Sequence, residues 1–257
     1  MVCGWIAPFG AAMIRQANLR DNSHVLDVAS GTGEPGLAAA ALVPRGRVTL
    51  TDLSERMLAV ASENAAHRGL HNVETKVCDA GALPFPDASF DAVLCRFGFM
   101  FFPDMGVAAK EFVRVARPGA RVSAAVWSQP EDNPWATIIA STIARHVAMP
   151  ASPPLAPSLF RCASGGLMSE VFDQAGLRDI TEEEVSCDMI HETAERYWDF
   201  MTDIAAPVVA GLARADSATQ QEIHAEVLDL AQQSSRDGQV YLQSTATVVA
   251  GTVSASS

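Results

Sequence analysis

The chain has 257 residues, of which 49% are hydrophobic, and its 30 acidic and 18 basic side chains leave a net charge of −12. This length and apolar content predict one large α/β core with insertions, and they exclude disorder as the main state. Proteins that wrap nucleic acid present Lys and Arg in a phosphate-neutralising patch, and no run of this sequence supplies one. Nucleic-acid and anionic-membrane partners are therefore disfavoured.

The N-terminal apolar stretch, residues 2–14, predicts a packing helix within residues 1–20, because Trp5, Phe9 and Met13 fall at helical spacing. The stretch is too short to span a bilayer, and no basic side chain precedes it as in a secretory signal. The cysteines form no CxxC pair and suggest neither a zinc site nor a disulfide framework. We therefore expect reduced cysteines, no metal and a cytoplasmic protein. The cysteines are Cys3, Cys78, Cys95, Cys162 and Cys187.

The first half of the chain, residues 21–127, alternates strands and helices and forms the predicted core. Residues 24–29 make an apolar strand that contains Asp27 and runs into a glycine turn and an alanine-rich helix. Residues 47–53 repeat the strand signal, and Ser54 can cap the next helix. Further strands at 72–78, 90–96 and 121–127 and an amphipathic helix at 105–116 complete the pattern. Such alternation predicts a parallel sheet covered on both faces.

Beyond Trp127 the rhythm changes. Residues 128–166 are rich in proline and are expected to form a lid. A helix at 167–175 and a strand near 179–186 return the chain to the core in residues 167–187. Helices at 194–204 and 217–233 predict a helical cap over residues 188–237. Residues 240–253, within the last segment 238–257, alternate and are rich in β-branched side chains, which predicts a late strand.

The glycine turn points to a nucleoside ligand. Gly31-x-Gly33-x-x-Gly36 lies between a strand and a helix, and Asp52 follows about twenty residues on, as in dinucleotide-binding folds. An acid there can accept hydrogen bonds from both ribose hydroxyls of either NAD or S-adenosylmethionine. Pro35 removes a backbone donor and Glu34 adds negative charge, so both disfavour a phosphate ligand. A tight turn without any ligand is the structural alternative. Asp27 is expected to organise the turn, because a buried carboxylate needs partners.

Five ordered segments resemble class I S-adenosylmethionine-dependent methyltransferases, and the similarity is greatest to the ubiquinone and menaquinone biosynthesis enzymes of the methyltransferase type 11 group. The segments are 25–33 (VLDVASGTG), 51–54, 78–80, 83–96 and 117–122. The resemblance covers about residues 20 to 130 and beyond them extends to architecture alone. It implies a Rossmann-like sheet of seven mostly parallel strands with helices on both faces, residues 240–253 as an antiparallel strand, and a helical cap or lid from the insertions.

The resemblance also implies a set of residues that bind S-adenosylmethionine. In the family pattern the glycine turn lines the methionine, the acid after the second strand holds the ribose, and the third-strand turn meets the adenine. The fourth strand end borders the sulfonium. The implied residues are Asp27, Ala29, Ser30, Gly31, Thr32, Gly33, Asp52, Leu53, Met57, Cys78, Asp79, Ala80, Arg96 and Phe97.

Two features depart from the family pattern. Only about twenty residues precede the first strand, so we expect Trp5 and Phe9 to cover the cofactor incompletely. Residues 96–102 lack the Asn/Asp-Pro-Pro-aromatic signature of enzymes that methylate exocyclic or amide amino groups. DNA-amine and glutamine acceptors are disfavoured accordingly.

Methyl transfer from a sulfonium is an in-line displacement that needs a positioned acceptor and a dry site, but no metal. The rings of Phe97, Phe99, Phe101 and Phe102 can wall the acceptor pocket, or they can pack the following helix. Asp104 is interpreted as a helix N-cap. No catalytic residue is assigned, and the remaining candidates for a base, for each of which a structural role is favoured, are His146, His191 and Tyr241. The expected acceptor pocket consists of Phe101, Trp127, Phe160, Tyr197 and Met201.

The sequence thus predicts a cytoplasmic S-adenosylmethionine-dependent methyltransferase, monomeric or homodimeric, without a membrane span. Its acceptor is expected to be a small, largely apolar, cyclic or aromatic metabolite, enclosed by the insertions 128–166 and 188–237. Two other functions remain open: an S-adenosylmethionine-binding protein without activity, and an NAD-dependent oxidoreductase.

Overall fold

A computed structural model describes residues 4–149 and 156–254 of the chain. It divides into two compact units. The first consists of Met1–Ser128, Pro157–Val185 and Ala246–Ser257, and the second consists of Gln129–Ala156 and Ser186–Thr245. Residues 157–166, which we expected in the lid, thus belong to the first unit. Cys3 and the proline-rich stretch 150–155 lie outside the described residues.

The sheet has the strand order β3-β2-β1-β4-β5-β8-β6, and the short β7 pairs with β8 as an eighth strand. Strands β1 to β5 are parallel, and β8 runs antiparallel to β5. This confirms the mostly parallel α/β sheet that the alternating pattern predicts. The strands are β1 (His24–Val28), β2 (Arg47–Asp52), β3 (Val73–Val77), β4 (Phe90–Arg96), β5 (Ala116–Trp127), β6 (Leu177–His191), β7 (Ser235–Arg236) and β8 (Gln239–Val253).

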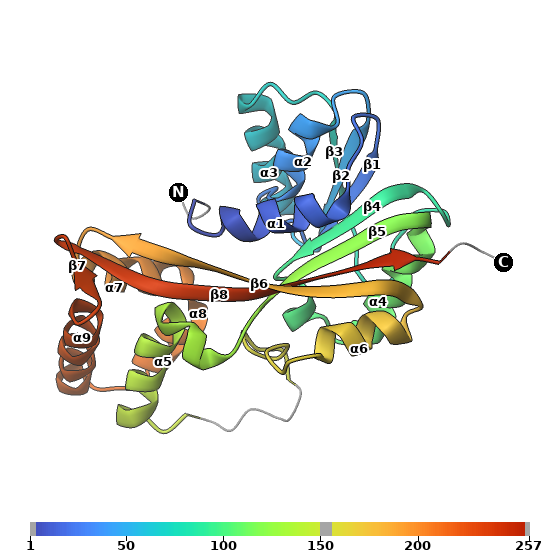
Figure 1. Ribbon diagram of the computed structural model, residues 1–257. Coiled ribbons are helices and arrows are strands. Elements are labelled where there is room, and N and C mark those ends of the chain that lie inside the picture. Colours follow the sequence, from blue (N-terminus) through green and yellow to red (C-terminus); the bar gives the residue numbers. More distant parts are fainter. Residues whose placement is uncertain (1–3, 150–155, 255–257) are drawn as a thin grey trace. The chain divides into compact units, whose positions relative to one another are not determined.

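Helices cover both faces of the sheet in the first unit. Helices α1 (Ala7–Ala17), α2 (Gly36–Leu42) and α3 (Glu55–His67) lie on one face, and α4 (Met105–Val115) and α6 (Leu167–Gln174) lie on the other (Figure 1). Central strands such as β1 and β4 bury nearly every side chain because both faces are covered, whereas the edge strand β3 is largely exposed. The core therefore lies around β1, β4 and β5.

Two local signals fix where helices begin in this unit. The Met57 N–H donates to Ser54 Oγ at 3.3 Å, and the Val107 N–H donates to Asp104 Oδ1 at 3.0 Å. Both are side-chain N-caps, which satisfy backbone donors that lack a partner in the first turn. The interpretation of Asp104 as an N-cap is confirmed.

The second unit is helical and includes residues 186–191 of β6 and 239–245 of β8. Its helices are α5 (Pro134–His146), α7 (Ala194–Ile204), α8 (Ala206–Leu212) and α9 (Ser217–Gln232), and the short 3-10 helix η2 (Pro130–Asp132) precedes α5. Buried side chains such as Ile139, Tyr197 and Ile223 form its core. Helix α5 lies in the segment expected as a lid, where Pro134 occupies the first helical position and its missing N–H costs no hydrogen bond. None of the helices in the described ranges is both long and apolar enough to cross a bilayer.

Candidate functional site

The strand order reverses direction at β1. On one side of β1 the sheet continues through β2 to β3, and on the other side it continues through β4 to β5. Because these strands are parallel, their carboxyl ends share one edge of the sheet. Open α/β sheets bind their ligands at this edge, beside the point of reversal. The residues implied for the cofactor follow the ends of β1, β2, β3 and β4, so the topology brings them to a single edge.

The turn after β1 is closed by backbone hydrogen bonds. The Ser30 N–H donates to the Thr51 carbonyl at 2.9 Å, and the Gly33 N–H donates to the Ser30 carbonyl at 2.9 Å. Gly31 and Gly33 have φ values of 54° and 113°. A Cβ on Gly33 would lie 2.7 Å from Leu37 Cδ1. The turn therefore needs glycine, and its bare backbone allows a ligand to approach closely.

Asp27 is fully buried beneath this turn. Its Oδ2 accepts a hydrogen bond of 2.7 Å from the Gly36 N–H at the start of α2, whereas its Oδ1 has no partner among the described residues. Burial raises the pKa of Asp27 to about 7, because the charged form loses its hydration. The side chain ties β1 to α2, which is the organising role that the sequence predicts.

Asp52 ends β2 beside the glycine turn. Its Oδ2 accepts a hydrogen bond from the Gly31 N–H at 2.9 Å, and its Oδ1 accepts one from the Ser54 N–H at 2.9 Å. Each carboxylate oxygen keeps further acceptor capacity after one such bond. The carboxylate is thus fixed by two backbone donors and remains able to accept from a pair of adjacent hydroxyls. These residues fit the ribose of a nucleoside.

Two apolar side chains next to this carboxylate are open to solvent. Leu53 is 73% exposed and Met57 is 47% exposed, although both are large and apolar. The Met57 sulfur comes within 3.8 Å of the position that a Cβ on Gly31 would take. Exposed apolar surface of this kind beside polar groups is typical of a ligand site. The position suits the two faces of a heterocyclic base.

The turn after β3 supplies a second acid. Asp79 Oδ1 accepts a hydrogen bond from the Gly81 N–H at 2.8 Å, and the Cys78 N–H donates to the Asp52 carbonyl at 3.2 Å. Ala80 is buried behind this turn. A pocket of about 260 Å³ opens beside Asp79, with Phe102 on its wall. This turn can therefore present both an acceptor and an enclosed surface to a ligand.

The end of β4 is strained and aromatic. Phe97 has a φ of 60°, which is costly for a bulky residue, and its N–H donates to the Ala125 carbonyl at 2.8 Å. Its ring stacks on Trp127 with centroids 4.1 Å apart. Phe9 of α1 meets both rings edge-on at 5.6 and 5.5 Å, and Trp5, which precedes α1, stacks on Trp127 at 5.6 Å. Strained residues cluster at functional sites.

Arg96 and the residues after Phe97 have different surroundings. Arg96 Nη1 donates to the Ile6 carbonyl at 3.3 Å, so it also contacts the segment that precedes α1. Phe99, in the 3-10 helix η1 (Phe99–Phe101), is fully buried against Phe112. Phe101, in contrast, is 53% exposed. The aromatic residues after β4 thus differ in role. Phe99 packs in the core, whereas Phe101 stays accessible to a ligand.

The three candidate bases all belong to the second unit. His146 Nε2 lies 2.7 Å from Glu226 Oε2, and the Tyr241 hydroxyl donates to Gln239 Oε1 at 3.2 Å. His191 packs beside the ring of Phe200, its Nε2 is buried without a partner among the described residues, and burial lowers its pKa. His146 and Tyr241 thus have structural partners. A catalytic role for any of the three stays a prediction.

The residues expected around the acceptor are divided between the units. Phe101, Trp127 and Phe160 belong to the first unit, and Tyr197 and Met201 belong to the second. Tyr197 is fully buried, and its hydroxyl donates to the Trp135 carbonyl at 2.9 Å. Met201 is buried as well. Both side chains contribute to the core of the second unit, and the proposed acceptor pocket stays a prediction.

Two supports of the glycine turn escaped the sequence-based prediction. Asn64 Nδ2 donates to the Thr32 carbonyl at 3.0 Å, and Glu34 pairs with Arg68, which compensates the charge that we expected to repel phosphate. Both partners come from α3 and the residue that follows it, so only the tertiary structure brings them to the turn. The positive φ of Ala29 and Phe97 has no sequence signal either, because neither residue favours that region.

Within the part of the chain that the structure describes, no group of three His, Cys, Asp or Glu side chains could hold a metal ion. Cys95 and Cys162 are buried thiols.

Part of the first unit matches a known family. Residues 25–119 match the family described as a methyltransferase domain. Ubiquinone/menaquinone biosynthesis C-methyltransferase UbiE of Burkholderia multivorans is 41% identical over 123 residues, which are 48% of this chain and 50% of that protein. Demethylmenaquinone methyltransferase of Geobacillus stearothermophilus is 40% identical over 119 residues, which are 46% of this chain and 51% of that protein. The chain thus spans about half the length of these curated relatives.

Solved structures share the fold over more of the chain. The YcgJ protein of Bacillus subtilis has a TM-score of 0.62 at 20% identity and covers 96% of this chain and 99% of its own. The [4+2]-cyclase SpnF has a TM-score of 0.61 at 22% identity and covers 96% of this chain and 81% of its own. These likenesses concern the fold alone. The family match adds that residues 25–119 are similar to a methyltransferase domain.

Proposed function

We propose that the protein transfers a methyl group from S-adenosylmethionine to a small, largely apolar metabolite with a cyclic or aromatic ring. The observation that carries the proposal is the carboxylate of Asp52. Backbone donors from Gly31 and Ser54 fix it at the reversal point of the sheet, where it can accept from two ribose hydroxyls. The family match of residues 25–119 supports this assignment.

Each part of the cofactor has a residue suited to it. Asp52 would hold the ribose, Leu53 and Met57 would flank the adenine, and Asp79 would accept from its amino group. The glycine turn would lie along the methionine portion, close to Arg96. When bound, S-adenosylmethionine supplies an electrophilic methyl group on a sulfonium. The stacked rings of Phe97 and Trp127 would help to exclude water from that end.

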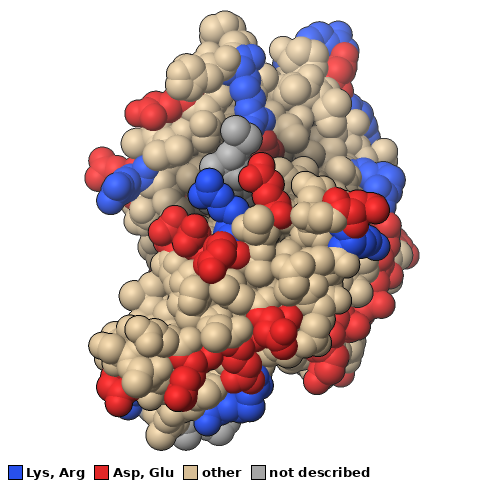
Figure 2. All heavy atoms as spheres, turned by 90° about the vertical axis from the view of Figure 1, so that its left-hand side faces the viewer, with Lys and Arg blue, Asp and Glu red and all other residues tan. Residues whose placement is uncertain are grey.

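The acceptor class follows from the surroundings of the reacting end and from charge. Phe101 offers exposed aromatic surface beside the stacked rings of Phe97 and Trp127, which suits an apolar ring. The net charge of −12 disfavours a nucleic acid. On the face that Figure 2 shows, the described Asp and Glu side chains are interspersed with Lys and Arg, and no continuous basic patch is visible there. One of the relatives is named a demethylmenaquinone methyltransferase, which is consistent with a ring acceptor.

The residues of this chain would act mainly by positioning. Between Phe97 and Met105 the ionisable side chain is Asp104, and its carboxylate already caps α4. A held acceptor with its nucleophilic atom opposite the sulfur needs alignment and a dry site more than proton transfer. We therefore propose no obligatory base on the loop after β4.

Binding of S-adenosylhomocysteine tests the proposal. Calorimetry should detect one site per chain, and Asp52→Ala should weaken it at least about tenfold, because a charged acceptor to two hydroxyls contributes about 1.5–3 kcal/mol. Glu170→Ala is the matched control, since it removes an exposed carboxylate on α6 in the same unit. Equal affinities for the wild type and Asp52→Ala would remove Asp52 from the ribose site.

Two further measurements separate the alternative functions. Transfer of a labelled methyl group from S-adenosylmethionine to any compound of a metabolite extract distinguishes an enzyme from a binding protein without activity. NADH binding in place of S-adenosylhomocysteine binding would favour an oxidoreductase. The fold likeness to a protein named a [4+2]-cyclase is a reason to run the transfer assay, since fold does not decide activity.

A further inference from the structure

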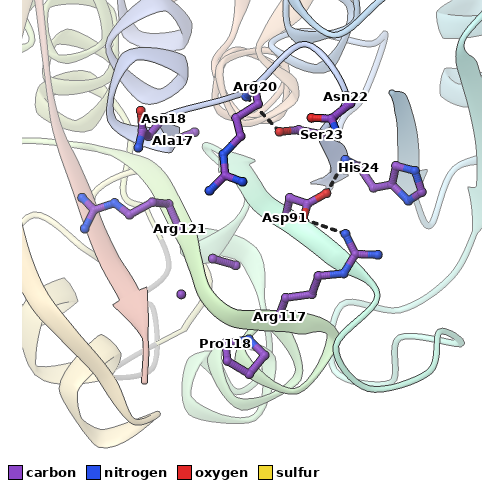
Figure 3. A pocket seen from close by; sticks show the side chains of 12 residues that line it. Ala17, Asn18, Arg20, Asn22, Ser23, His24, Asp91, Arg117, Pro118 and Arg121 are labelled. Carbon is purple, nitrogen blue, oxygen red and sulfur yellow. Dashed lines mark hydrogen bonds and ion pairs between the residues drawn. The ribbon is translucent and has the colours of Figure 1, made fainter. Parts of the chain in front are cut away.

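A second pocket lies at the other edge of the same sheet. It forms where α1 ends and β1, β4 and β5 begin, and its volume is about 450 Å³, within the range of small-molecule sites. Figure 3 shows its charged side chains, Arg20, His24, Asp91, Arg117 and Arg121. Strand β1 has five residues, so about 17 Å of strand separate this pocket from the glycine turn. The pocket is therefore distinct from the cofactor site.

Among the described residues that line this pocket, Asp91 supplies the carboxylate, and it is already engaged. Asp91 Oδ1 lies 2.6 Å from Arg117 Nη1, and Asp91 Oδ2 accepts a hydrogen bond of 2.7 Å from the His24 N–H. The His24 imidazole itself points away from the middle of the pocket (Figure 3). Asp91 and Arg117 thus compensate each other, and Asp91 is not free to neutralise a second guanidinium.

Arg121 and Arg20 lack such compensation. Arg121 is held by neutral acceptors, because its Nε donates to the Gln16 carbonyl at 3.1 Å and its Nη1 donates to Thr252 Oγ1 at 2.9 Å. The Arg20 guanidinium is directed into the pocket between Asp91 and Arg121 (Figure 3). Neither Arg20 nor Arg121 forms an ion pair with any residue in the described ranges. Two uncompensated guanidinium groups therefore line one cavity.

This arrangement runs against the overall charge of the protein. Acidic side chains outnumber basic ones by 30 to 18, yet three arginines line this pocket beside a single acid. Guanidinium groups that share a cavity repel each other, and an oxyanion between them reverses the sign of that interaction. The planar fork of arginine matches both carboxylate and phosphate oxygens. We infer that this pocket binds the oxyanion of a small organic molecule, either a phosphate or a carboxylate group, with Arg20 as the principal contact.

The inference can be tested with simple anions. Inorganic phosphate and, separately, succinate are titrated into the protein at constant ionic strength, each with and without saturating S-adenosylhomocysteine. We expect one saturable site that S-adenosylhomocysteine does not block, and the tighter of the two anions identifies the favoured group. Arg20→Ala and Arg20→Gln should each weaken binding about tenfold. Arg214→Ala, which removes an exposed arginine of the second unit, should leave it unchanged.

Arg20 is the decisive position because, among the described residues, its guanidinium forms no hydrogen bond or ion pair whose loss would destabilise the protein. Arg121→Ala also removes two internal hydrogen bonds, so its effect is read only after its melting temperature has been compared with that of the wild type. Binding that both Arg20 variants retain, or that Arg214→Ala weakens equally, would overturn the inference. Failure of both anions to saturate a site below about 10 mM would overturn it as well. None of these outcomes depends on whether S-adenosylhomocysteine binds at the other edge.

Discussion

The buried carboxyl group of Asp27 should make the stability of the protein depend on pH. Its pKa of about 7 lies above the ordinary 3.8, because burial disfavours the charged form more than the Gly36 N–H favours it. Between these two values the folded protein binds a proton that the unfolded chain has released. The free energy of unfolding therefore falls as pH rises. The contribution is complete below about pH 4 and is lost as pH rises through 7.

The size of the effect follows from the two pKa values. At 1.36 kcal/mol per pH unit, the interval from 3.8 to about 7 corresponds to about 4 kcal/mol. Between pH 5 and pH 7 the free energy of unfolding of the wild type should fall by about 2 kcal/mol through this group. Asp27→Asn keeps an oxygen that can accept the hydrogen bond from the Gly36 N–H, but it cannot ionise. The variant should therefore lack this part of the pH dependence.

Urea unfolding of the wild type and Asp27→Asn at pH 5, 6 and 7 measures the difference directly. Other titrating groups contribute to the pH dependence of unfolding in both proteins, so their contributions cancel when the two are compared. Glu170→Gln, at an exposed acid of the same unit, serves as the control and should follow the wild type. The carboxyl carbon of Asp27 should also titrate near pH 7 by NMR. If the unfolding free energies of the wild type and Asp27→Asn changed in parallel with pH, or if Asp27 titrated with a midpoint below pH 5, the raised pKa would be refuted.

Four other outcomes are expected. Asp79→Ala should weaken the binding of adenosyl ligands more than the binding of the inosine analogues, which lack the amino group. Equal losses of affinity in calorimetry would contradict this. Gly98→Ala should destabilise the protein by about 1–3 kcal/mol in thermal unfolding, because its Cβ would lie 2.6 Å from the Cys95 sulfur. Asp104→Ala should cost about 1 kcal/mol through the lost cap and leave S-adenosylhomocysteine affinity unchanged. Once an acceptor is known, His191→Ala should keep the shape of the kcat profile near neutral pH, and loss of a steep limb there would identify a base.

The features that could be read from the sequence are those that local chemistry determines. The strand, glycine turn and helix around Gly31, the caps at Ser54 and Asp104, and the amphipathic helix α4 each depend on residues close together in the chain. The position of Asp52 was also predictable, because strand β2 must place its last residue at the ligand-binding edge. A parallel sheet converts such local signals into a shared site.

Other features depend on contacts that only the folded chain creates. Helix α5 was missed because prolines and short apolar clusters around it weaken the helical signal, although Pro134 at its first position is harmless. The contacts from Phe9 to Phe97 and Trp127 join residues about ninety positions or more apart, and no spacing rule connects them. The arginine pocket is hidden for the same reason, since Arg20, Arg117 and Arg121 form no run in the sequence.

The aromatic stack gives the protein a built-in optical reporter. The rings of Trp5 and Trp127 are stacked 13° from parallel. The ring of Phe97, at the end of β4, also stacks on Trp127. Indole emission is sensitive to the polarity and quenching groups around the ring. A molecule that binds at the carboxyl ends of β4 and β5 should therefore change the emission wavelength or quantum yield of Trp5 and Trp127. The other two tryptophans, Trp135 and Trp198, emit from the second unit. Ligand binding to the first unit can thus be followed by the intrinsic tryptophan fluorescence of unlabelled protein.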